Sequence, residues 1–381
     1  MKVKLSDAFE LQMGKTPPRN DRECWGEGHK WISISDIGST GKYIDATKEE
    51  ITDAGVSKSG IKVVPKGTVI MSFKLSIGKT AITAEDMYTN EAIMAFINKG
   101  RYEINTDYLY HMCKGIDWLA GTNKAVLGLT LNKATMSEKE IVIPSMAEQL
   151  HVVSVLDKMD ELIALRKEQL AKLDQLVKSR FIELFGDPVD NPKGWKKDKA
   201  ENYIDLLSGF PFDSSKYTES GVNICGGLII MPQRIEWGDC KHWCSIDGYE
   251  EYALNENDIV IALDRPWISE GFKIAMVEAE HLPALLIQRT ARIRAIGLNQ
   301  FYLMYCFLLG GFDKHCNVTG SLVPHISAKD IRSFAIMLPP IDLQEQFAAF
   351  VEQTDKSKLA IQQSLDKLEL LKKSLMQEYF G

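Results

Sequence analysis

The sequence predicts an α+β fold in two tandem copies, each a β-rich domain followed by a long helix. Two observations support this prediction. The chain repeats itself at an offset of 195 residues (381 − 186 = 195), and each copy ends in a segment with seven-residue apolar periodicity. We expect the two helices to form an antiparallel coiled coil and to give the single chain approximate twofold symmetry.

The repeat is clearest where each copy ends. SRFIELFG (179–186) and SLMQEYFG (374–381) share serine, glutamate, phenylalanine and glycine at the same places. Pro144 and Pro339 keep this offset, as do Gly14 and Gly209. A period this long indicates a duplicated domain, because the units of solenoid proteins are several-fold shorter.

A capping-box spacing opens each helical segment. Ser145 precedes Glu148 by three residues, and Asp342 precedes Glu345 in the same way. Apolar residues then recur by sevens without internal proline or glycine, which is typical of a coiled coil. The seam residues are Leu156, Ile163, Leu170, Val177 and Leu184 in the first segment and Ile361, Leu365, Leu368, Leu371 and Leu375 in the second. An ordinary amphipathic helix on its own domain is the alternative, but pairing buries both seams at once.

These patterns give five segments. We expect a first domain at 1–143, a helix at 144–186, a linker at 187–195, a second domain at 196–338 and a second helix at 339–381. The linker, DPVDNPKGW, contains two prolines and a glycine. Strand-like runs broken by turn formers lie at 30–37, 67–73, 79–83, 92–97, 226–231, 257–263, 272–277 and 291–296, with helical stretches at 106–120 and 301–312.

Composition places the chain among globular proteins. There is no apolar run long enough to span a membrane and no signal-peptide core at the start, so we expect a cytoplasmic protein without a membrane partner. The formal charge is −7. The excess of acidic side chains lies in the second domain, because residues 187–335 contain 15 basic and 20 acidic side chains, whereas residues 1–140 contain 19 and 18. Net charge does not exclude a local basic face.

The sequence contains few motifs typical of catalytic, cofactor-binding or metal sites. There is no Walker loop, and Asn191-Pro192 is not followed by the proline and aromatic residue of an adenine-methylation loop. Cys240, His242 and Cys244 could suggest zinc, with Cys225 as a distant fourth ligand, but paired C-x-x-C knuckles are missing. We therefore expect no catalytic residue, no cofactor and no metal in this chain.

Polar loops supply the candidate binding residues. Their basic, hydroxyl and amide side chains suit DNA, where such groups read base edges while nearby lysines hold phosphates. A solvated loop is the alternative interpretation for each of them. The candidates are Lys15, Lys74, Lys79, Lys124 and Lys133 in the first domain and Lys216, Arg234, Arg265, Arg289, Asn317 and His325 in the second.

The duplicated motifs together resemble the specificity subunit of Type I restriction-modification systems. They are the helix starts IPSMAEQL (143–150) and LPPIDLQEQF (338–347), the two FG helix ends, and the openings LSDAFELQMGKTP (5–17) and YIDLLSGFPF (203–212). The resemblance covers essentially the whole chain. It implies a non-catalytic subunit with two target-recognition domains, each reading one half of a split double-stranded DNA site. It also implies that the helices set the gap and dock two modification subunits, which restriction subunits with translocase and nuclease activity join.

Two other functions remain open from the sequence. The chain could be a coiled-coil scaffold that joins two protein-binding domains without DNA. It could also be a truncated enzyme with its own methyltransferase or nuclease, although the missing motifs disfavour that. Salt-sensitive DNA binding separates the scaffold from a DNA reader.

Overall fold

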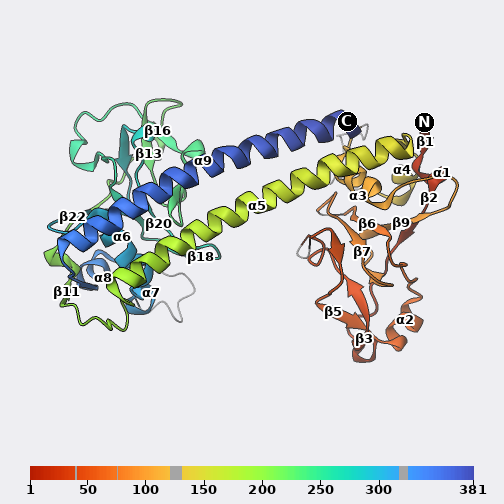
Figure 1. Cartoon of the computed structure of the whole chain (residues 1–381), viewed down its shortest axis with the longest axis horizontal. Helices are drawn as coiled ribbons and strands as arrows, with labels where there is room; N and C mark the ends of the chain where they lie inside the picture. Colours follow the sequence, from red (N-terminus) through yellow and green to blue (C-terminus); the bar gives the residue numbers. More distant parts are fainter. Residues whose placement is uncertain (39–40, 75, 121–130, 317–324) are drawn as a thin grey trace. The chain divides into compact units, whose positions relative to one another are not determined.

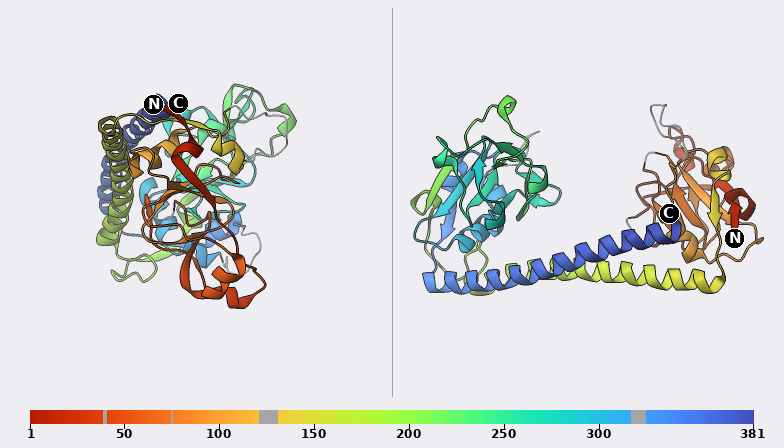
Figure 2. Two further views of the ribbon diagram at one scale, coloured as in Figure 1. Left: turned by 90° about the vertical axis from the view of Figure 1, so that its right-hand side faces the viewer. Right: turned by 90° about the horizontal axis from the view of Figure 1, so that it is seen from above.

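The chain folds as two compact units. The computed structural model describes residues 1–38, 41–74, 76–120, 131–316 and 325–381. Unit 1 comprises Met1–Lys167 and Gln363–Gly381, and unit 2 comprises Glu168–Gln362. Each unit therefore contains one β-rich domain and part of both long helices, α5 (Met146–Phe185) and α9 (Ile341–Phe380). Within each unit the two helices lie side by side along one side of the domain (Figures 1 and 2).

Unit 1 is built on a five-stranded sheet with a three-stranded sheet beside it. The larger sheet has the order β2 (Phe9–Met13), β9 (Ile93–Asn98), β6 (Val69–Ser72), β7 (Thr80–Thr83) and β4 (Tyr43–Ile44). The smaller has the order β5 (Glu49–Ile51), β3 (Trp25–Ile32) and β8 (Tyr88–Thr89). A two-stranded ladder joins β1 (Lys2–Lys4) to β10 (Glu140–Val142), and the shorter helices are α1 (Leu5–Ala8), α2 (Asp53–Ser59), α3 (Thr106–Gly115) and α4 (Lys133–Ser137).

Unit 2 repeats this plan. Its larger sheet has the order β12 (Ile204–Ser208), β22 (Thr290–Ala295), β17 (Ile259–Ala262) and β20 (Ile274–Met276). Its three-stranded sheet has the order β16 (Lys241–Trp243), β13 (Val222–Cys225) and β21 (Ala284–Leu286). The remaining elements are the ladder β11 (Lys197–Lys199) with β23 (Ala335–Met337), the pairs β14 (Ile230–Met231) with β15 (Arg234–Ile235) and β18 (Trp267–Ile268) with β19 (Gly271–Phe272), and the helices α6 (Gln300–Leu309), α7 (Phe312–His315) and α8 (Ala328–Ser333).

The duplication is confirmed in the ladder that precedes each long helix and in the helix starts. Lys2 pairs with Val142 in unit 1, and Lys197 pairs with Met337 in unit 2, which shifts both partners by 195 residues. The long helices start at residues 146 and 341, again 195 apart. The predicted fold of two β-rich domains, each followed by a long helix that packs against the other, is confirmed. Among the residues that the structure describes, no helix is both long and apolar enough to cross a membrane.

Gly14 and Gly209 match because the same close approach recurs in both units. A Cβ atom added at Gly14 would lie closer than 3.0 Å to the carbonyl oxygen of Thr89, and one at Gly209 would meet Ile287 in the same way. Backbone cannot move aside as a flexible side chain can. Glycine is therefore required where β2 and β12 leave their sheets.

Local predictions differ from the structure at one helix cap and in two strands, of which the strand expected at 30–37 already ends at Ile32. The Ser145 capping box is present, with the Glu148 amide donating to Ser145 Oγ at 3.3 Å, but the second box is wrong. Helix α9 already begins at Ile341, so Asp342 lies inside its first turn. The strand expected at 226–231 is also mostly wrong, because Gly226 O accepts the amide of Ile229 at 3.1 Å and closes a turn before β14.

The long helices pack antiparallel within each unit. In unit 1, Asp160 pairs with Lys372 and Lys167 pairs with Glu369, so partner numbers fall along α9 as they rise along α5. Lys358 pairs with Asp174 in unit 2. Of the expected seam residues, Leu371 is 47% exposed. The others are buried or half-buried, namely Leu156, Ile163, Leu170, Val177, Leu184, Ile361, Leu365, Leu368 and Leu375.

Each long helix starts beside one domain and ends in the core of the other unit. The Phe185 ring at the end of α5 lies 4.7 Å from that of Tyr302 in unit 2. The Phe380 ring at the end of α9 lies 5.5 Å from that of Tyr108 in unit 1. Both tyrosine hydroxyls donate to the strand before a long helix, Tyr302 to Met337 O at 3.0 Å and Tyr108 to Val142 O at 3.2 Å. These contacts explain why the chain ends as its middle does.

A buried glutamine fixes the start of each long helix. In unit 2, Gln344 Nε2 donates to Pro339 O at 2.8 Å, and its Oε1 accepts the Asn299 amide at 2.9 Å. In unit 1, Gln149 makes the equivalent bonds to Pro144 O at 3.1 Å and from the Asn105 amide at 2.8 Å. Asn105 and Asn299 cap α3 and α6. Each glutamine therefore ties its long helix to a helix of its domain.

We predict that Gln344→Ala destabilises unit 2. Gln344 is 2% exposed, so the substitution leaves the half-buried Asn299 amide and the buried Pro339 carbonyl without this partner. The expected loss in the free energy of unfolding is about 2 kcal/mol. Urea denaturation measures it, with Gln363→Ala, on an exposed position of α9, as the matched control. Equal midpoints for the two variants would contradict the role given to Gln344.

A second polar link in unit 1 contains a buried histidine. His111 of α3 is fully buried, and its Nε2 lies 2.6 Å from Asp157 Oδ1 on α5. Lys42 bonds Asp157 at 2.9 Å and Asp107 at 2.8 Å. Burial holds the pKa of His111 below its usual value, although Asp157 opposes this. Burial raises the pKa of Asp157, but hydrogen bonds from Lys42 and His111 outweigh it and leave that pKa low.

This link predicts a pH dependence of stability. The unfolded chain binds a proton on His111 near pH 6.5, before the folded protein does, so the free energy of unfolding falls as pH drops through that range. Protonation of Asp157 adds a further loss only at lower pH. His111→Gln should flatten the dependence between pH 7 and about pH 5, whereas His151→Gln, on the exposed face of α5, should not. Identical pH profiles for the wild type and His111→Gln would rule this out.

Candidate nucleic-acid interface

One end of the main sheet gathers basic residues in each unit. In unit 1 the ladder aligns Met13, Met94, Met71 and Thr80 in one row across four strands. In unit 2 the equivalent row is Ser208, Ala291, Ile261 and Ile274. The connections that leave these rows carry Lys15, Lys74 and Lys79 in unit 1 and Arg265 and Arg289 in unit 2. We call each region the loop end of its sheet.

The loop end of unit 1 holds its lysines in different ways. Lys15 Nζ donates to the carbonyls of Ser59 and Gly60, both at 3.1 Å, and so closes the end of α2. Lys74 is half-buried, with its ammonium 5.4 Å from the Phe73 ring. Lys79 is exposed. This surface therefore offers cations at several depths.

Glu91 is the acidic group of this region. Burial raises its pKa, but a hydrogen bond from Thr16 and the charge of Lys74 outweigh burial and lower it below the usual value. The carboxylate is thus ionised at neutral pH and holds Thr16 in place. Carboxylates at a DNA interface orient cations and can accept a hydrogen bond from cytosine N4.

Asp264 organises the loop end of unit 2. Its Oδ1 lies 2.6 Å from His325 Nδ1, and its Oδ2 lies 3.3 Å from Arg289 Nε. The structure therefore brings Arg289, His325 and the neighbouring Arg265 together, although they are far apart in sequence. Arg289 remains 75% exposed despite its ion pair.

The backbone at this cluster is strained. Arg265 has a φ of 47° and Arg289 a φ of 64°, in the left-handed region that bulky side chains rarely adopt. Such strain costs free energy and is found preferentially at ligand-binding and catalytic positions. Its presence at two exposed arginines of one cluster favours a binding role for this surface.

The other candidate residues are held in different ways. Lys133 begins α4, which packs against α1 at the start of β2 and hence away from the loop end. Lys216 pairs with Asp213 at 4.0 Å. The guanidinium of Arg234 lies 2.9 Å from Glu236 and 3.2 Å from Glu270. Lys124 and Asn317 fall outside the described residues.

Sequence reasoning missed Lys273. The carbonyl of Lys273 accepts the Ala262 amide at 3.1 Å, just as the carbonyl of Lys79 accepts the Ser72 amide at 2.8 Å, so the two lysines hold the same ladder position. The sequence repeat does not reveal this match, because Ser72 and Ala262 are 190 residues apart (262 − 72 = 190) and the connection in unit 2 is longer. The ladder hydrogen bonds are needed to find it.

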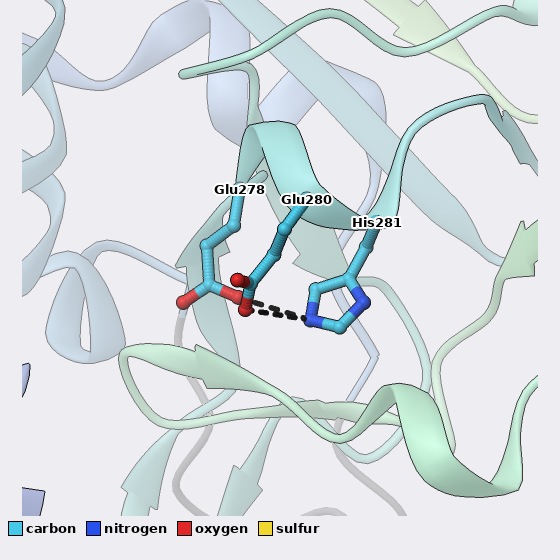
Figure 3. A group of neighbouring side chains, drawn as sticks. All are labelled: Glu278, Glu280 and His281. Carbon is cyan, nitrogen blue, oxygen red and sulfur yellow. Dashed lines mark ion pairs between the residues drawn. The ribbon is translucent and has the colours of Figure 1, made fainter. Parts of the chain in front are cut away.

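The possible zinc ligands do not gather into a site. Cys240 Sγ lies 3.8 Å from His242 Nε2 and donates to Asn223 Oδ1, while Cys244 is exposed. Among the described residues, the group of three potential metal ligands is instead Glu278, Glu280 and His281 (Figure 3). His281 pairs with both glutamates, at 3.6 and 3.2 Å. This cluster is satisfied by its own ion pairs.

Comparisons with known proteins agree along the chain. A family model, the Type I restriction modification DNA specificity domain, matches residues 1–175 and 245–371. The Type I restriction enzyme MjaIX specificity subunit of Methanocaldococcus jannaschii is 26% identical, over 92% of this chain and 85% of the relative. The MjaVIII specificity subunit of the same organism is 23% identical, over 98% and 90%.

Solved structures share the fold. A chain from a structure describing complex assembly and conformational transition of a type I R-M system has a TM-score of 0.61 at 19% identity, over 100% of this chain and 97% of that one. The S subunit of a Type I restriction-modification system from M. genitalium has a TM-score of 0.54 at 14% identity, over 100% and 96%. The family model covers well over half of the sequence. The chain therefore belongs to the Type I restriction-modification DNA specificity family, whose specificity subunits are non-catalytic.

Proposed function

We propose that this chain reads a split double-stranded DNA site, with the loop end of each unit contacting one half-site. Family membership supports the general role. The two units have equivalent loop ends with cations at the same strands. This equivalence supports the assignment of one half-site to each unit. A duplicated reader suits a target in two parts, because the spacing between half-sites follows from the arrangement of two similar domains.

The loop ends of the two units differ in charge and shape, so they suit different DNA sequences. The connection between β6 and β7 spans residues 73–79, and its equivalent between β17 and β20 spans 263–273. Exposed cations such as Lys79 and Arg289 provide phosphate contacts, which position the protein. The connections differ in length and side chains, so each unit presents its own donors and acceptors to base edges.

The long helices supply the docking surface in this proposal. Apolar side chains remain exposed on both, with Leu165 and Leu176 on α5 and Leu359 and Leu370 on α9. Two modification subunits bound there would carry the methyl donor and perform adenine methylation, and restriction subunits would join them. The specificity subunit itself would contribute recognition and spacing, so its own residues act by binding and positioning DNA.

Arg289→Ala tests the DNA interface of unit 2. In the complex with modification subunits, loss of one phosphate contact should weaken binding to a target duplex and reduce the salt dependence of log K by about one unit. Binding is measured over a series of salt concentrations. The matched control is Arg101→Ala, an exposed arginine after the opposite end of β9. Salt-independent binding by the wild-type complex would instead favour a scaffold for protein partners.

A further inference from the structure

One exposed leucine lies beside the basic cluster of unit 2. Leu228 is 93% exposed, the highest value among the large apolar side chains that the structure describes. The fold gains little from a leucine there, because apolar side chains stabilise a protein by leaving water. Isolated exposed leucines are common, so the surroundings of Leu228 decide whether it has a function.

The backbone holds Leu228 in a fixed turn. Gly226 O accepts the amides of Ile229 at 3.1 Å and Ile230 at 3.3 Å. Ile229 and Ile230 are buried in a hydrophobic cluster of unit 2. The turn is therefore closed by hydrogen bonds and anchored on one side by two isoleucines, and Leu228 is the residue that it exposes to solvent.

Lys273 fastens the same turn to the loop end of the sheet. It is 7% exposed, and its ammonium donates to the carbonyl of Gly227. Burial lowers the pKa of Lys273, and no carboxylate pairs with it within the described part of the chain. A Cβ atom at Gly227 would lie 3.6 Å from Ala262 Cβ and 3.8 Å from Arg289 O. The turn thus packs on the strands that carry the Asp264 cluster.

The charges around Leu228 suit a nucleic-acid partner. Arg265, Arg289, His325 and Lys273 belong to the strands and connections of this loop end, where Asp264 pairs with two of them. The nearby acidic groups Glu236 and Glu270 both pair with Arg234. An apolar tip among cations fits the major groove, where the methyl group of thymine lies between phosphate backbones. A purely apolar partner surface would gain nothing from these cations, whereas the phosphates of DNA pair with them.

We propose that Leu228 is a specificity-determining residue of unit 2 that contacts the 5-methyl group of a thymine. The Gly226–Ile229 turn presents the side chain, and Lys273 positions the turn. The proposal rests on the DNA-reading function proposed above. It adds one base-contacting residue and the chemical group that this residue recognises.

Leu228→Ala tests this inference in the complex with modification subunits. Mapping of methylated adenines should show one half-site relaxed at a single A·T pair, with about tenfold less discrimination there. The other half-site and the gap should be unchanged. Replacing that thymine by deoxyuridine should weaken wild-type binding, with no further loss in the variant. The matched control is Ile296→Ala, which is 55% exposed just after the far end of β22.

The outcomes distinguish a failure of the proposed DNA-reading function from a failure of the role given to Leu228. If the wild-type complex modifies no split site, the proposed function fails. If it does but Leu228→Ala keeps the same site and affinity, only the role of Leu228 fails. A uniform loss of affinity without relaxed specificity, a neutral response to deoxyuridine, or loss of subunit assembly would each also overturn that role.

Discussion

The packing of each long helix end into the other unit is the constraint on which the rest of the structure depends. Phe185 packs against Tyr302 and Phe347 in unit 2, with ring centroids 4.7 and 5.7 Å apart. Phe380 occupies the equivalent position against Tyr108. These aromatic contacts require the C-terminal half of α5 to belong to the second unit and that of α9 to the first. Each hydrophobic core is therefore incomplete without a helix that begins beside the other domain.

This constraint explains which parts of the sequence repeat. The FG helix ends and the prolines before the helices build this junction, whereas Gly14 and Gly209 repeat because each permits a close backbone approach at the loop end of its sheet. The connections that differ between copies form much of the two loop ends, for example 73–79 in unit 1 and 263–273 in unit 2. A duplicated framework can thus keep its geometry while its two loop ends diverge.

Much of the fold could be predicted from the sequence because the long repeat and the heptads extend over many residues, so single exceptions do not hide them. The prediction of the second capping box was wrong because Asp342, although of a suitable residue type, lies within α9. The helix begins at Ile341, so Pro340 occupies the N-cap position. The strand expected at 226–231 was wrong because two glycines favour a turn over a ladder. Leu371 fits the periodic pattern yet faces solvent, since α9 has more apolar residues than one seam can bury.

The candidate site was less predictable, because it depends on contacts between distant segments. Nothing local in the sequence links Asp264 to Arg289 and His325. Charge counts also misled, since the acidic surplus of the second domain coexists with this cluster. Lys273 could not be matched to its counterpart Lys79 from the repeat, because the two connections differ in length. The buried glutamines Gln149 and Gln344 were within the quoted motifs, but their roles required hydrogen-bond partners that only the fold reveals.

The most direct test of the account is to lengthen α5 and map the modified DNA sites. Four residues inserted after Leu170 extend a helix by about 6 Å and rotate its C-terminal part by about 40°. One base pair spans about 3.4 Å. The gap between half-sites should widen by one or two base pairs while both half-sites stay the same. The same insertion at the exposed turn of Gly248 should leave the gap unchanged. An unchanged gap with full activity after the α5 insertion would contradict the account.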